Sequence, residues 1–178
     1  DPDASIVVVG TAAGLEGRLV PARGYELVTI PKLPFPRRPN RAAARFWSQL
    51  RPIVNELQSL AVDRAVDVVV GFGGYAAAPA YLAARSSKIP LVIHEANAKP
   101  GLANRLGSRF TPFVGVAFRR TLLPHAHFVG MPLRREIEEL DPGKARVEAR
   151  SFFGLVDDRP TLLVTGGSLG ARQLNETV

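Results

Sequence analysis

Short apolar runs alternate with helix-like segments along the whole of this 178-residue chain. The runs are continuous stretches of Val, Ile and Leu, which is typical of parallel strands covered on both faces. The alternation predicts an α/β fold, a Rossmann-like doubly wound parallel sheet. The predicted strands are residues 5–10, 26–30, 67–71, 91–95, 113–116, 126–129 and 161–165. The predicted helices are residues 11–22, 41–64, 76–86, 101–108 and 142–153, the second with Pro52 as a kink or restart.

Positive charge is concentrated in two acid-free stretches, and the net charge of the chain is +7. One lies between Glu26 and Glu56, and the other lies between Glu95 and Glu136. Such blocks suit phosphates, nucleic acid or an anionic membrane, although two solvated basic faces explain them equally well. The chain has no cysteine, and its three histidines lack zinc-site spacing, so we predict no metal site. No run is long enough for a transmembrane helix.

Gly-rich turns follow two of the predicted strands. The run Gly71–Ala76 fits the pattern G-x-G-x-x-A, and Glu95 follows about 20 residues later, as in dinucleotide-binding folds. A nicotinamide site and a merely tight turn both explain this run. The second turn contains Gly166, Gly167 and Ser168, and two glycines and a serine at a helix start can cradle a diphosphate.

Three polar residues close the predicted strand at residues 91–95. They are His94, Glu95 and Asn97, and strand ends of this kind line the ligand crevice in open α/β sheets. Adjacent polar side chains there can accept, donate and relay a proton. A capping turn that starts the loop before Pro100 explains the same residues.

Four motifs in this order resemble the MurG family, the N-acetylglucosaminyltransferases that form lipid II: FGGYAAAPAYLAA, IPLVIHEANAKPGLANRLGSR, VGMPLR and VTGGSLGARQLNETV. The resemblance implies a GT-B fold, in which two Rossmann-like domains face a cleft. It also implies an inverting hexosyltransferase of peptidoglycan synthesis, peripheral on the cytoplasmic face of the bacterial membrane. The donor would be UDP-N-acetylglucosamine and the acceptor lipid I, with no cofactor and no nucleic-acid partner.

The resemblance also implies roles for single residues. The acceptor pyrophosphate would face Gly73, Gly74 and Tyr75. His94 and Glu95 would line the catalytic cleft, while Asn97, Arg134 and Ser168 would bind the donor and Asn175 would support them. Met131 and Ala96 depart from the family's pattern, which has Asn and Gln there.

A membrane-facing patch is implied as well. Its members would be Leu33, Phe35, Arg37, Arg38, Arg41, Arg45 and Trp47, with Lys32 and Phe46 beside them. Apolar side chains would enter the interface while cations meet anionic headgroups. The alternative is that Phe46 and Trp47 are core residues, Phe46 more than Trp47.

By the same resemblance, the chain holds an acceptor domain at residues 1–132, a linker at 133–160 and the start of a donor domain at 161–178. The first strand, and a Gly-rich loop with the proposed general base, would precede Asp1. Most of the donor site would follow Val178. We therefore expect no transfer by this chain alone, and weak or no binding of a UDP-sugar.

Two rival functions fit parts of the sequence. A nicotinamide-dependent oxidoreductase needs the Gly-rich turn after the first strand, but two predicted strands precede Gly71. A nucleic-acid-binding module would use the positive charge, but no recognised motif or aromatic stacking platform accompanies it.

Overall fold

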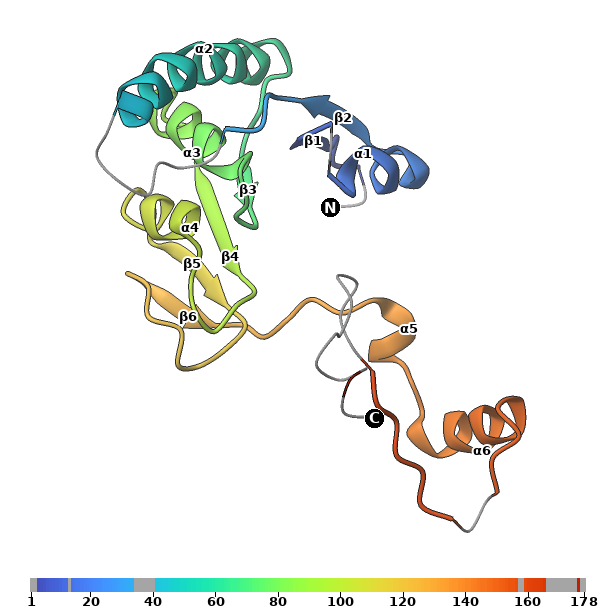
Figure 1. Cartoon of the computed structure of the whole chain (residues 1–178). Coiled ribbons are helices and arrows are strands. Elements are labelled where there is room, and N and C mark those ends of the chain that lie inside the picture. Colours follow the sequence, from blue (N-terminus) through green and yellow to red (C-terminus); the bar gives the residue numbers. More distant parts are fainter. Residues whose placement is uncertain (1–2, 13, 34–40, 157–158, 166–175, 177–178) are drawn as a thin grey trace. The chain divides into compact units, whose positions relative to one another are not determined.

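A computed structural model of the chain describes residues 3–12, 14–33, 41–156, 159–165 and 176, without the side chains of 41–45 (Figure 1). The chain divides into two compact units, Asp1–Met131 and Pro132–Val178. The first unit contains all the described strands, and the second contains two described helices. The domain limits expected from the sequence stay predictions.

The described strands of the first unit are all parallel and form two sheets. One sheet pairs β1 with β2, and the other has the order β3-β4-β5-β6. The bounds are β1 Val7–Gly10, β2 Glu26–Thr29, β3 Val69–Gly71, β4 Leu91–Glu95, β5 Phe113–Val116 and β6 Ala126–Phe128. The predicted α/β class is confirmed, and each of these strands lies within its predicted range.

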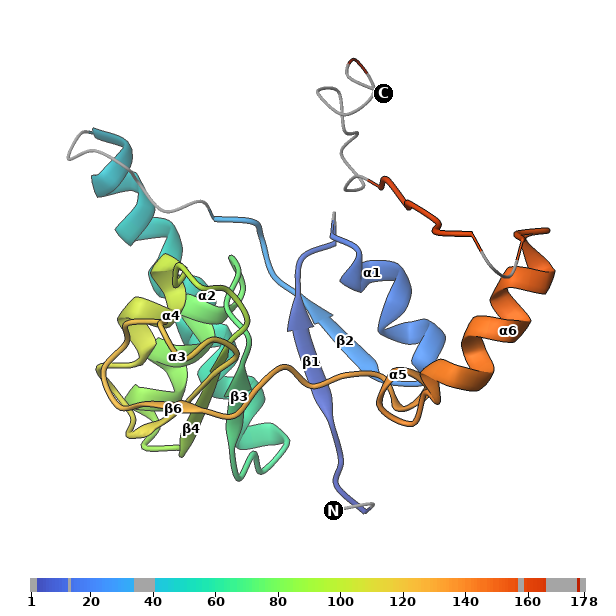
Figure 2. The ribbon, with the colours of Figure 1, turned by 90° about the horizontal axis from the view of Figure 1, so that it is seen from below.

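Helices connect most of these strands, as parallel pairing requires. They are α1 Glu16–Leu19, the 3₁₀ helix η1 Pro21–Arg23, α2 Arg41–Asp63, α3 Ala77–Ser86 and α4 Leu102–Gly107. Figure 2 shows α1 beside the β1–β2 pair. Helix α2 continues through Pro52, so the predicted restart is wrong. Helix α3 packs on β3 and β4, and α4 packs on β4.

One buried cluster fills the space between the four-stranded sheet and helices α3 and α4. Tyr81 lies at its centre with 0% of its surface exposed. Gly71 and Gly107 face this ring, and a Cβ at either position would overlap it. Both glycines therefore make room for one large side chain, which fixes how closely α4 and β3 approach α3.

A second buried cluster joins the β1–β2 sheet to helices α2 and α3. It contains Ile30, Ile53, Leu57 and Ala83, and Leu33 and Ala76 pack against it among others. The segment after β2 is thereby held beside the start of α3.

Two neighbouring aromatic residues of α2, Phe46 and Trp47, differ in burial. Phe46 is 4% exposed, and Trp47 is 63% exposed. Phe46 is therefore a core residue, whereas Trp47 faces solvent. No helix in the described part of the chain is long and apolar enough to cross a membrane.

The second unit contains two described helices in Pro132–Phe152, α5 Arg135–Glu138 and α6 Pro142–Phe152. The sequence predicted α6 but missed the single turn of α5. The Asp141 carboxylate caps α6 by accepting from the backbone N–H groups of Gly143 and Lys144 at 2.9 and 3.2 Å.

The predicted strand at residues 161–165 is wrong, because none forms there. A strand needs a paired neighbour, and the described residues of the second unit supply no second strand. An apolar run alone does not make a strand.

The close approach at Gly107 gives the first testable prediction. Replacing Gly107 with Ala places a methyl group against Tyr81 and within 2.7 Å of Ile93 Cδ1, both fully buried. We expect the free energy of unfolding to fall by about 1–3 kcal/mol, because the core has no room. Urea denaturation measures this change.

Gly101→Ala is the matched control. Its φ is −69°, and a Cβ there would meet only Glu95 Oε2, at 3.8 Å. Its free energy of unfolding should stay within about 0.5 kcal/mol of the parent chain. Equal stability of the two variants would contradict tight packing at Gly107.

Candidate functional site

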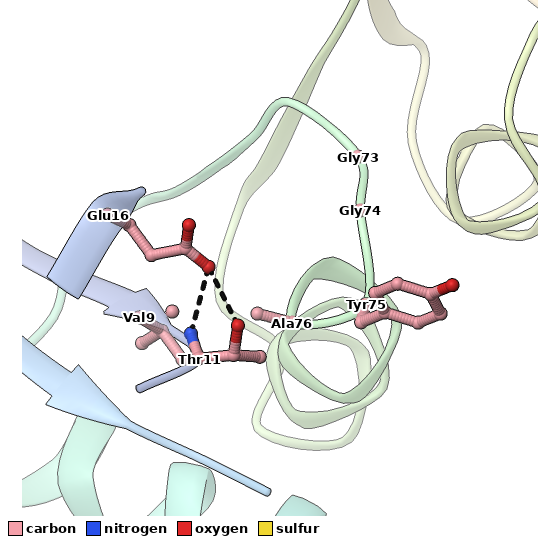
Figure 3. Close-up of a pocket in the computed structure, with 8 residues that line it drawn as sticks. Val9, Thr11, Glu16, Gly73, Gly74, Tyr75 and Ala76 are labelled. Carbon is pink, nitrogen blue, oxygen red and sulfur yellow. Dashed lines mark hydrogen bonds between the residues drawn. The ribbon is translucent and has the colours of Figure 1, made fainter. Parts of the chain in front are cut away.

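A pocket of about 330 Å³ lies where β1 ends and α3 begins (Figure 3). Its wall comes from two loops that follow strands, which is the edge where open α/β sheets bind ligands. The lining residues are Val9, Gly10, Thr11, Glu16, Gly73, Gly74, Tyr75 and Ala76. The three residues implied by resemblance for the acceptor pyrophosphate are thus together in one pocket.

One side of this pocket is formed by the Gly-rich loop and the start of α3 (Figure 3). Gly73 and Gly74 have φ of +84° and +85°, the left-handed region that side chains avoid. The N–H groups of Gly74, Tyr75 and Ala76 have no acceptor among the described residues. No side chain caps α3 at Ala76. Free N–H groups at a helix start attract an anion.

The opposite side of the pocket is a hydrogen-bonded pair that sequence reasoning missed. Oε1 of Glu16 accepts from the backbone N–H of Thr11 at 3.1 Å and from its hydroxyl at 2.9 Å (Figure 3). The pKa of Glu16 is lowered, most by a hydrogen bond from its own backbone N–H and next by these two bonds from Thr11. One feature of the sequence could have indicated this pair: Thr11 directly follows β1, and Glu16 begins the next helix.

A buried network ties the Gly-rich loop to the loop after β4. The Tyr81 hydroxyl accepts from the Gly73 N–H at 3.3 Å and donates to Asn104 Oδ1 at 2.7 Å. Asn104 Nδ2 donates to Glu95 Oε2 at 3.0 Å. Burial raises the pKa of Tyr81 to about 12, so its hydroxyl keeps its proton to donate.

Glu95 closes this network with both carboxylate oxygens engaged. Oε1 accepts from the backbone and side-chain N–H groups of Asn97, at 2.9 and 2.8 Å. Oε2 accepts from the N–H of Gly101 at 2.9 Å as well as from Asn104. Burial raises the pKa of Glu95, but these four hydrogen bonds outweigh it and the net pKa is lowered.

Glu95 therefore positions the 95–101 loop and does not offer a free carboxylate. It is 2% exposed, so it cannot reach a ribose hydroxyl as the nicotinamide pattern requires. The sequence therefore matches the dinucleotide-binding pattern, but the structure lacks the exposed carboxylate that this pattern requires.

His94 points to the other face of the sheet, because successive strand residues alternate. Its Nε2 lies 2.9 Å from the carbonyl of Gly130, which only accepts, so this nitrogen carries the proton. His94 and Glu95 do not share one space. A catalytic role for His94 or Glu95 stays a prediction.

Of the remaining predicted site residues, two are described by the structure and two are not. Asn97 is exposed, with its amide nitrogen held by Glu95 and its carbonyl accepting from the Thr121 hydroxyl at 3.1 Å. Arg134 is exposed at the start of α5 in the second unit. Ser168 and Asn175 lie outside the described residues.

The predicted membrane patch is only partly described. Leu33 packs against the second cluster, so it is not a free apolar side chain. Trp47 is exposed. Phe35, Arg37 and Arg38 lie outside the described residues, as do the side chains of Arg41 and Arg45. Within the described part, no three acidic or His side chains converge as a metal site.

Comparison with known proteins gives the class. The glycosyltransferase family 28 N-terminal domain matches residues 3–116. The crystal structure of Acinetobacter baumannii MurG is similar over 78% of this chain and 40% of its own, with a TM-score of 0.61 and 27% identity. This GT-B neighbour agrees with the parallel α/β fold.

Two curated relatives cover the whole of this chain. Both are named UDP-N-acetylglucosamine–N-acetylmuramyl-(pentapeptide) pyrophosphoryl-undecaprenol N-acetylglucosamine transferase. The one from Leifsonia xyli subsp. xyli is 66% identical, and the one from Clavibacter sepedonicus is 63% identical. The chain spans about half the length of these relatives, 50% and 49%. This chain belongs to the glycosyltransferase 28 family, through its N-terminal domain.

The engaged carboxylate of Glu95 gives a second prediction. In Glu95→Gln an amide NH₂ replaces one acceptor oxygen and faces two donors. We expect the free energy of unfolding at neutral pH to fall by about 1–3 kcal/mol, because buried donors lose their acceptor. Denaturation in urea measures it, and Glu56→Gln, an exposed change on α2, should stay within about 0.5 kcal/mol.

The same substitution tests the pH dependence. Because the folded pKa of Glu95 lies below its ordinary 4.5, its contribution to stability is fully present above pH 4.5. The contribution disappears as the pH falls through the folded pKa. The parent chain should therefore lose stability in that window more steeply than Glu95→Gln, and parallel curves would refute this role of the carboxylate.

Proposed function

We propose that this chain is the acceptor-binding part of an enzyme that transfers N-acetylglucosamine from UDP-N-acetylglucosamine to lipid I. The product would be lipid II, a precursor of peptidoglycan. The observation that carries this proposal is that Gly74, Tyr75 and Ala76 line a pocket in a family 28 domain, and that their N–H groups have no acceptor among the described residues. The two curated relatives carry this activity in their names.

The pocket supplies what a diphosphate-linked acceptor needs. The positive φ of Gly73 and Gly74 lets the backbone approach the phosphate without a side chain between them. The partial positive charge of the α3 start favours the phosphate oxygens. Holding the diphosphate here orients the acceptor sugar hydroxyl toward the donor sugar.

The roles of the loop after β4 are indirect in this proposal. Glu95 fixes the turn that carries Asn97, and Asn97 stays at the surface beside the strand end. Contacts of Asn97, Arg134 and Ser168 with the donor follow from the resemblance and belong to the proposal. No metal or cofactor is part of it.

A membrane surface is the second partner in the proposal. Trp47 is exposed on α2 and lines a groove of about 470 Å³ with Leu50, Val54 and Leu82, while Arg51 adds a cation. An exposed indole next to cations suits the interface of an anionic bilayer. A lipid-linked acceptor would reach the enzyme at such a surface.

Isothermal titration of this chain tests the acceptor site. We expect geranyl diphosphate to bind and NADH, a mixed-sequence oligonucleotide and UDP-N-acetylglucosamine to bind weakly or not at all. Replacing Gly74 with Ala should weaken geranyl diphosphate binding by about tenfold, because a Cβ is strained at positive φ and relief of that strain moves the N–H groups from the positions that bind the diphosphate.

Gly24→Ala is the matched control for the strain. Gly24 also has a positive φ, +78°, and a Cβ there meets nothing within 4 Å. It lies at the end of η1 and does not line the pocket. If both substitutions left binding unchanged, or if NADH bound more tightly than geranyl diphosphate, the acceptor assignment would be abandoned.

Vesicle flotation tests the membrane surface. With vesicles rich in phosphatidylglycerol, Trp47→Ala should weaken binding roughly tenfold, because one large apolar side chain no longer enters the interface. Phe113→Ala, which removes an aromatic side chain 60% exposed on β5, should have little effect. An equal loss in both variants would show that Trp47 has no special part.

A further inference from the structure

Lys32 is held beside the pocket by its neighbours in the chain. Ile30 is buried in the second cluster, and its N–H donates to the Gly10 carbonyl at 2.9 Å. Leu33 packs against the same cluster, as does Ala76 at the start of α3. A buried anchor before Lys32 and a partly buried one after it thus leave its backbone little freedom to move away from the α3 start.

The ammonium group of Lys32 lies against a residue that lines the pocket. Its Nζ is 4.9 Å from the centre of the Tyr75 ring, within the range of a cation–π contact. Among the described residues, Lys32 forms no ion pair within 4.0 Å. The ammonium therefore lies against the aromatic ring, and no carboxylate in the described part of the chain pairs with it.

The electrostatics of the pocket indicate where the Lys32 charge acts. The pKa of Glu16 is lowered first by hydrogen bonds from its own and Thr11's N–H and hydroxyl groups, and to a smaller degree by the Lys32 charge. The Lys32 charge therefore acts on a residue that lines the pocket. The free N–H groups of the α3 start contribute only partial charges, whereas a diphosphate brings more than one full negative charge. Glu16 adds another negative charge to the same pocket.

We infer that Lys32 is a binding residue for the diphosphate of the polyprenyl-linked acceptor, held ready by the Tyr75 ring at the pocket formed by Gly73–Ala76. On binding, the ammonium would leave the ring face and pair with a phosphate oxygen. A lysine is suited to this step because its charge sits at the end of a flexible stem. The inference rests on the proposed function, since it takes the pocket as the acceptor site.

Lys32 is thereby distinct from the basic segment that follows it. The sequence places Lys32 beside the predicted membrane patch, where a lysine would meet lipid headgroups. In the structure it lies over Tyr75 at the pocket instead. Membrane binding by Lys32 is thus the rival outcome of the test.

The experiment compares three substitutions in the whole chain. They are Lys32→Met, Lys32→Arg and Lys88→Met, the last being an exposed lysine in the turn after α3, outside the pocket. Titration with geranyl diphosphate should show about tenfold weaker binding for Lys32→Met. Lys32→Arg, which keeps the charge, and Lys88→Met should each stay within about twofold. All three should give the same circular dichroism spectrum, because both lysines are exposed.

Further arms identify the ligand. UDP is titrated into the same variants, and flotation with phosphatidylglycerol vesicles is repeated for each. Lys32→Met should leave vesicle binding unchanged, and any UDP binding should not depend on Lys32. The inference is overturned if Lys32→Met binds geranyl diphosphate as Lys88→Met does, if UDP shows the same Lys32 dependence, or if only vesicle binding is lost. If the parent chain does not bind geranyl diphosphate at all, the proposed function itself fails.

Discussion

The hydrogen-bonded path from Tyr81 through Asn104 to Glu95 is the constraint on which the site depends. It crosses the buried layer between helices α3 and α4 and reaches two loops, at Gly73 and at Asn97. Each buried polar group on it costs about 1–3 kcal/mol if left unpaired, so the path is stable only when complete. Completeness in turn fixes the geometry of both loops. Gly71 and Gly107 belong to the same constraint, because only glycine leaves space for the Tyr81 ring.

Most of the fold could be predicted from apolar runs because a buried parallel strand needs little else. The strands β4 and β5 have the bounds predicted for them to the residue, and a proline directly precedes each run, at Pro90 and Pro112. The run at residues 161–165 looked equally good and forms no strand. The apolar residues of this run could form a buried strand. A strand also needs a neighbouring strand to pair with, and the local sequence does not show whether one is present. Helix α5 was missed for the opposite reason, because a single turn has no periodicity to detect.

The candidate site was predictable only where backbone chemistry decides. Gly73 and Gly74 predict a turn whose backbone can approach a phosphate closely, and both have a positive φ in the structure. The network behind them was not predictable, because Tyr81 and Asn104 are 23 residues apart and each looks like an ordinary helical residue. Lys32 shows the same limit for charge. A run of cations predicts an anionic partner, but the packing of Ile30 and Leu33, which the run does not reveal, places Lys32 beside Tyr75.

His94 and Glu95 at the end of β4 have different surroundings, because successive side chains of a strand point to opposite faces. His94 and Glu95 are adjacent in sequence and point to opposite faces of the sheet. Glu95 turns inward, where four hydrogen bonds keep it charged and make it a support for the 95–101 loop. An acidic residue at this distance from a G-x-G-x-x-A turn is the letter pattern of a ribose-binding site. Here the carboxylate serves the protein's own loops, which leaves the free N–H groups of the Gly-rich turn as the part of the site open to an anion.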